Sequence, residues 1–63
     1  METGMKDLLA ALEKLRDDAA EAALIRDLAT QKAKRDLFDR LYHHHARLAD
    51  EIERVLQDGR LSQ

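Results

Sequence analysis

Two apolar series with the same spacing run through this 63-residue chain and mirror each other about Thr30. Both alternate steps of three and four residues, the spacing of the a and d positions of a heptad repeat along one side of a helix. The first series consists of Met5, Leu8, Leu12, Leu15, Ala19 and Ala22, and the second of Phe38, Leu41, His45, Leu48, Ile52 and Val55. Every member of one series has a counterpart at the same distance from Thr30 in the other. Two helices that fold back on each other near residue 30 need this match, so the sequence predicts an all-α antiparallel helical hairpin.

Composition supports one small helical domain over residues 1–63. The chain has no Pro, no Cys and only two Gly, so it has neither strong helix breakers nor a disulfide or thiolate metal site to stabilise a small core. We expect a helix over about 4–28, a turn over about 29–32, a second helix over about 33–57 and a frayed tail over 58–63.

Residues with known capping preferences lie near the expected ends of the helices. The hydroxyl of Thr3 can accept a hydrogen bond from the first turn of the first helix, and Thr30 can cap the second helix in the same way. Gly59 suits the left-handed conformation that often follows a helix.

Two other arrangements of the same residues remain open. One uninterrupted helix would be about 80 Å long at 1.5 Å per residue. Three shorter helices would need a break at Asp17 and Asp18, where Asp18 and Glu21 resemble a capping box. The mirrored series favours the hairpin over the long helix, and the register that continues through Ala19 argues against the break.

The apolar surface of each expected helix is wider than one partner helix can cover. Further residues flank the two series on both sides: Leu9, Arg16, Ala23, Ala11, Asp18 and Ile25 on the first helix, and Tyr42, Ala49, Leu56, Leu37, His44 and Glu51 on the second. Leaving the apolar flanks in water costs about 25 cal/mol per Å². The sequence therefore predicts a homodimer of hairpins that forms a four-helix bundle with coiled-coil-like packing.

The histidines are the main candidates for chemistry. His43, His44 and His45 are consecutive, so they point about 100° apart on a helix and cannot bind one ion together. Asp39 and His43 are four residues apart, but two ligands are too few for a structural zinc site. His45 falls within the apolar series, where a buried imidazole can act as a register-fixing or pH-dependent polar layer. We expect no catalytic residues, no metal site and no cofactor.

A basic cluster beside the expected turn is the candidate for contact with nucleic acid or with a protein partner. It consists of Lys32, Lys34 and Arg35 and can be extended by Arg26. The chain as a whole carries 11 basic and 13 acidic residues, so no overall field attracts nucleic acid or an anionic membrane. No apolar run reaches the roughly 18–20 residues of a membrane span, and no secretory signal is evident at the N-terminus. We therefore expect a cytoplasmic protein.

The chain length, the turn near residue 30 and the two mirrored series resemble the repressor-of-primer (Rop) proteins. This resemblance implies a hairpin that dimerises into an antiparallel four-helix bundle and binds paired RNA on the outer face of its first helices. The corresponding outward positions here carry Ala10, Lys14, Asp18 and Ile25, and the first helix has no aromatic residue. The segment from Leu28 to Glu53 also resembles small bacterial helical-hairpin proteins of unknown function. We therefore expect a non-enzymatic module that acts through protein–protein contacts, with RNA binding and a histidine-based metal or pH response as alternatives.

Overall fold

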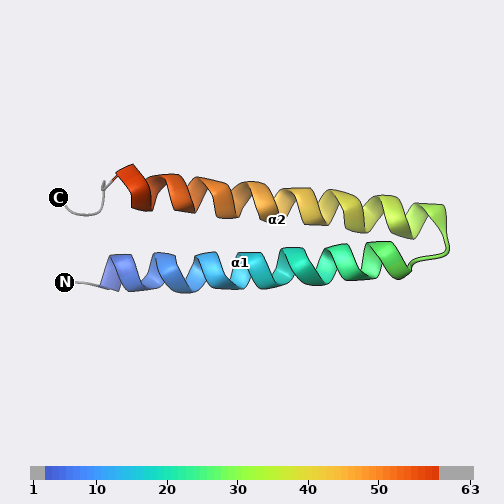
Figure 1. Cartoon of the computed structure of the whole chain (residues 1–63), viewed down its shortest axis with the longest axis horizontal. Helices are drawn as coiled ribbons and strands as arrows, with labels where there is room; N and C mark the ends of the chain where they lie inside the picture. Colours follow the sequence, from blue (N-terminus) through green and yellow to red (C-terminus); the bar gives the residue numbers. More distant parts are fainter. Residues whose placement is uncertain (1–2, 59–63) are drawn as a thin grey trace.

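The computed structural model describes residues 3–58, which form two helices joined by a short connection (Figure 1). Helix α1 spans Thr3–Leu28 and helix α2 spans Lys32–Asp58. The helices lie side by side in opposite directions, so the start of α1 and the end of α2 lie at the same end of the molecule. The predicted hairpin is thus confirmed for the described residues, and the single long helix and the three short helices are not observed. Of the expected tail, Asp58 is the last residue of α2, and residues 59–63, with Gly59, lie outside the described residues.

The observed helices differ from the expected ranges of 4–28 and 33–57 by one residue at three of their four ends. Helix α1 continues without interruption through Asp17 and Asp18, the site of the alternative break. The possible capping box there does not end the helix, since the residues on either side belong to one helical register.

The connection consists of residues 29–31, and its backbone hydrogen bonds define both helix ends. The amide of Ala29 donates to the carbonyl of Arg26 at 3.3 Å, a tightened last turn of α1. The amide of Arg35 donates to the carbonyl of Gln31 at 3.0 Å, so Gln31, and not Thr30, occupies the N-cap position of α2. Three non-helical residues are needed because the chain must cross the 8–10 Å between two packed helix axes.

The core between the two helices is small and rich in alanine. The buried residues are Leu12, Ala19, Ala22 and Ala49, with exposed fractions of 3–7%, and no described side chain falls below 2%. Ala49, expected beside the apolar series, is buried because a small side chain allows α1 to approach closely. Of the predicted series, Met5 is 37% exposed, and the larger members are half-buried: Leu8, Leu15, Phe38, Leu41, His45, Leu48, Ile52 and Val55.

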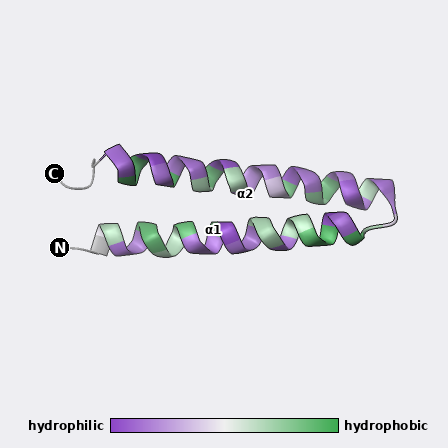
Figure 2. Cartoon of the chain, in the orientation of Figure 1, coloured by the Kyte–Doolittle hydropathy of each residue, from purple (hydrophilic) through white to green (hydrophobic). Residues whose placement is uncertain are grey.

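The two helices distribute their apolar residues differently. In Figure 2 the hydrophobic colour on α2 lies mainly along the edge nearest α1, whereas α1 carries it on both edges. Three of the most exposed large apolar side chains belong to α1: Leu9 at 50%, Leu24 at 59% and Leu28 at 72%. Packing within the hairpin therefore covers the apolar side chains of α2 more completely than those of α1.

Candidate functional site: an open apolar face

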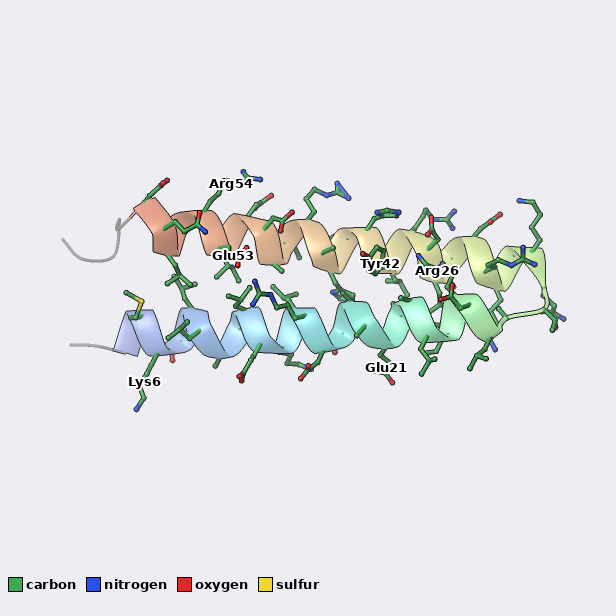
Figure 3. All side chains as sticks on the ribbon, viewed as in Figure 1. Lys6, Glu21, Arg26, Tyr42, Glu53 and Arg54 are labelled. Carbon is green, nitrogen blue, oxygen red and sulfur yellow. The ribbon has the colours of Figure 1, made fainter. Side chains whose placement is uncertain are left out.

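One side of the hairpin is closed by polar side chains that cross from α1 to α2. Arg16 forms an ion pair with Glu53, and Arg26 Nη1 donates to Asp39 Oδ1 at 2.9 Å. The guanidinium of Arg26 also lies over the ring of Tyr42, 5.1 Å from its centroid, as a cation–π contact. Figure 3 shows Arg26, Tyr42 and Glu53 between the two helices. We call this side, defined by Arg16, Arg26, Asp39, Tyr42 and Glu53, the bridged face.

Arg26 is held in place by two carboxylates at once. Its Nε donates to Asp27 Oδ1 at 3.0 Å, in addition to the bond to Asp39. Hydrogen bonds to Asp27 and then Asp39 raise the pKa of Arg26 above its ordinary value, so the side chain remains charged. The side chain is only 25% exposed. Arg26 therefore belongs to the bridged face and not to the basic cluster at the turn.

The cross-helix ion pairs are displaced from a simple mirror about Thr30. That mirror places Arg26 opposite Lys34 and Arg16 opposite His44, whereas both arginines reach residues farther along α2. The cause is the tilt of side chains toward the N-terminus of their own helix. This tilt points away from the turn on α1 and toward the turn on α2, so an α1 side chain meets an α2 residue with a higher number.

The opposite side of the hairpin has an open apolar surface that no other part of the described chain covers. In the half that lies away from the turn, a hollow of about 370 Å³ is lined by Leu8, Leu15, Leu48, Glu51, Ile52 and Val55. In the half near the turn, a hollow of about 270 Å³ is lined by Asp18, Glu21, Ala22, Ile25, Phe38, Leu41 and His45. We call the surface formed by these two hollows the open face. Nine of the twelve residues of the predicted apolar series line it.

His45 lies in the half of the open face near the turn, at a position of the predicted apolar series. Its Nδ1 atom is buried and has no hydrogen-bond partner among the described residues. Its ring is 5.7 Å from that of His44, with a tilted geometry. Asp18 and Glu21 line the same hollow as His45. The imidazole is therefore an incompletely satisfied polar group within the predicted apolar series.

The other histidines do not form a metal site. His43 Nε2 lies 3.6 Å from Asp39 Oδ2, the pair anticipated from their spacing, and both side chains are about half exposed or more. Within residues 3–58, no three His, Asp or Glu side chains are grouped in a way that could hold a metal ion. Asp39 is also engaged by Arg26, which competes for the same carboxylate.

The basic cluster at the turn is partly neutralised by neighbouring carboxylates. Lys32 Nζ donates to Asp36 Oδ2 at 2.7 Å, and this bond lowers the pKa of Asp36 below its ordinary value of 3.8. Lys34 and Arg35 are exposed. With Arg26 turned to the bridged face, the cluster of four expected cations is reduced to three at the turn, one of them paired.

Comparison with known proteins shows no family for this chain. No family model matches the chain, and no curated protein or solved structure is significantly similar to it. The resemblance to Rop proteins thus rests on length and heptad spacing alone. Neither helix, over the residues that the structure describes, is both long and apolar enough to cross a membrane.

The bridged face was not predicted from the sequence. Arg16 and Glu53 are 37 residues apart, and each has charged neighbours on its own helix that are equally plausible partners. The only signal for the bridged face is the set of small residues that it covers, Ala19, Ala46 and Ala49, which line a shallow hollow together with Arg16 and Tyr42.

Proposed function

We propose that this chain is a non-enzymatic interaction module that self-associates through its open face, as a homodimer of hairpins in a four-helix bundle. The observation that supports this most strongly is the half-burial of the large apolar residues that line the open face, while the few buried residues are mostly alanine. A second layer of helices would remove these side chains from water at about 25 cal/mol per Å². Contiguous apolar surface of this kind marks interaction sites.

The asymmetry between the two faces supports one partner surface and not two. Cross-helix ion pairs and the arginine–tyrosine contact cover the bridged face, whereas the open face is lined by leucine, isoleucine, valine and phenylalanine. A bundle needs only one apolar face from each hairpin. The proposed dimer therefore uses the open face and leaves the bridged face in solvent.

Leu48→Lys tests this proposal, with Leu24→Lys as a matched control. Leu48 lines the open face, whereas Leu24 is 59% exposed and lines neither hollow of that face. Sedimentation equilibrium at micromolar concentration should give twice the 7.2 kDa chain mass for the native chain and for Leu24→Lys. Leu48→Lys should shift the equilibrium to monomer, because a buried lysine would lack a partner. A native chain that is folded, helical and monomeric would refute the proposal.

RNA binding in the manner of the Rop proteins is less well supported. At the turn, Lys32 is paired with Asp36, and on α1 the exposed Lys14 is 3.5 Å from Asp18. A salt series separates the two functions, since phosphate contacts make binding fall steeply with salt concentration. Steeply salt-dependent RNA binding by a monomeric chain would favour the RNA function.

A further inference from the structure

The charged residues that border the open face have a complementary order on the two helices. On α1, Asp7, Lys14 and Glu21 are seven residues apart and so share one line along the helix, with Asp18 beside it. On α2, Arg40, Arg47 and Arg54 share such a line, with Glu51 beside it. We call these two sets of four residues the α1 edge and the α2 edge.

Three edge residues line the open face, and the other members continue along the same lines of each helix. Asp18 and Glu21 line its hollow near the turn. Glu51 lines its hollow away from the turn, and Glu51 and Arg54 together line a smaller neighbouring hollow. In Figure 3, Glu21 projects away from α2 and Arg54 projects away from α1. The two edges therefore do not meet within one hairpin, but a second hairpin on the open face would bring edges of different copies together.

The net charges of the two edges are opposite. The α1 edge has three acids and one base, for a net charge of −2, and the α2 edge has three bases and one acid, for a net charge of +2. Asp58, which continues the line of Glu51 and lines the same small hollow, lowers the net charge of that side of α2 to +1. Read from the end away from the turn, the signs on α1 are minus, plus, minus, minus. On α2 they are plus, minus, plus, plus, so the single inverted charge is second in order on both edges, although Glu51 lies five residues farther from Thr30 than Lys14 does.

Two hairpins can meet face to face with their turns at the same end or at opposite ends. With turns at the same end, α1 of each copy lies over α2 of the other at the same level. The residues that then lie level are Asp7 with Arg54 and Glu21 with Arg40. Lys14 lies level with Arg47 and is paired with Asp18 on its own helix. With turns at opposite ends, α1 faces α1 and α2 faces α2, so each edge meets an edge of its own net charge.

We infer that the two copies pack with their turns at the same end, an arrangement selected by the opposite charges of the α1 and α2 edges. This inference rests on the proposed dimer and specifies how its second copy is placed. The apolar lining agrees with it, because the strongly apolar half away from the turn then faces its own equivalent. Charge complementarity of this kind sets orientation more than it adds affinity. The arrangement also brings Lys32, Lys34 and Arg35 of both copies to one end of the bundle.

A spin label at the turn distinguishes the two arrangements. The chain contains no cysteine, so Thr30→Cys gives one nitroxide label for each copy at an exposed position. The same-end arrangement predicts a distance set by neighbouring helices, about 10 Å between axes, extended by the label arms. The opposite-end arrangement predicts a separation close to the 48 Å length of the hairpin.

Sedimentation of the labelled protein separates failure of this inference from failure of the proposed function. A dimer with the short distance supports the inference, and a dimer with the long distance overturns it but leaves the self-association intact. A labelled chain that sediments as a monomer, like the unlabelled one, overturns both.

A charge exchange tests the edges themselves. Glu21→Arg should weaken dimerisation about tenfold, because it replaces attraction by repulsion at two symmetric places. Adding Arg40→Glu to the same chain should restore the dissociation constant to within about twofold of the native value if these residues face each other. Asp17→Arg is the control, since Asp17 is exposed and lines neither hollow of the open face. A double variant that dimerises no more tightly than Glu21→Arg alone would overturn the inference.

Discussion

His45 is a polar residue at a position that its spacing assigns to the apolar series. The structure places it on the open face, with a buried Nδ1 that has no hydrogen-bond partner within residues 3–58. A buried polar atom without a hydrogen bond costs free energy that an apolar side chain of similar size does not. Its neighbours in the hollow include Asp18 and Glu21, which carry the only other side-chain polar groups there. At the scale of single residues, this imidazole is the described side chain whose buried polar atom lacks a hydrogen bond.

Replacing His45 with Leu should therefore stabilise the protein. We expect the free energy of unfolding at pH 8 to rise by about 1 kcal/mol, because the variant removes an unpaired polar atom and fills the space with carbon. Chemical denaturation followed by circular dichroism measures this. His43→Leu is the control and should change stability by less than about 0.5 kcal/mol, since His43 is exposed. Destabilisation by His45→Leu would mean that the imidazole finds its partner in the assembled protein.

Asp36 gives a prediction with a defined pH dependence. Because the hydrogen bond from Lys32 lowers the folded-state pKa of Asp36 below 3.8, the pair stabilises the fold above that value. This contribution is lost as the pH falls through the lowered folded-state pKa, where the carboxyl is protonated in both states. Asp36→Asn should thus lower the midpoint of thermal unfolding slightly at pH 7, and this difference should shrink as the pH falls below 3.8 and through the lowered folded-state pKa. The pair is exposed, so the effect is small.

Asp17→Asn controls for the general effect of removing a negative charge. Asp17 is exposed and makes no ion pair with the described residues. An Asp36→Asn effect that equals the Asp17→Asn effect at every pH would contradict a specific role for the bond from Lys32.

At the scale of elements, the connection at residues 29–31 separates two helices that each keep one register. The bond from Arg35 to Gln31 begins α2, and the bond from Ala29 to Arg26 tightens the end of α1. Between them lies no strong breaker, since Ala29 and Gln31 favour helix and only Thr30 has a lower helix propensity. The chain reverses there because the packing of the two helices outweighs continuation of one helix.

Lengthening the connection should be tolerated. Two glycines inserted after Thr30 should leave the helical circular dichroism signal nearly unchanged, since each doubling of loop length costs only about 0.6 kcal/mol. The same insertion after Asp17, inside α1, should lower helicity and stability strongly, because it shifts the phase of the apolar series on either side. Equal losses from the two insertions would contradict a hairpin in solution.

At the scale of the whole molecule, a single hairpin buries few of the side chains of this chain. Its core consists of four buried residues, three of them alanine. Chains of this size rarely gain enough stability from one small core without a staple or a partner. The chain has no cysteine for a disulfide, and the proposed association through the open face would add burial.

Association predicts a stability that depends on protein concentration. The midpoint of thermal unfolding should rise by several degrees between 1 and 100 μM, because the dimer is favoured by mass action. Leu48→Lys should abolish most of this dependence, because Leu48 lines the open face. Leu24→Lys should preserve it, because Leu24 lines neither hollow of that face. A midpoint of the native chain that does not change with concentration would count against a dimer that forms in this range.

The sequence by itself determined the helices and their antiparallel pairing. Steps of three and four residues define one face of a helix, and the match of the two series about Thr30 indicates the fold-back. These are local or periodic properties, so they can be read without knowing which residues touch. The N-cap was predicted at Thr30 and lies at Gln31, since the number of residues in the turn depends on the distance that it must cross.

Only the tertiary structure decided which side of the hairpin is closed. On each helix, residues flank the heptad series on two sides, and the pattern does not tell these sides apart. Arg16, Arg26 and Glu53 have possible partners on their own helix as well as on the other. The tilt of side chains toward their own N-termini selects the cross-helix pairs, and these pairs, with the contact between Arg26 and Tyr42, cover one face. Leu48 and His45 stay partly exposed on the other face, because no element of the described chain packs over that face.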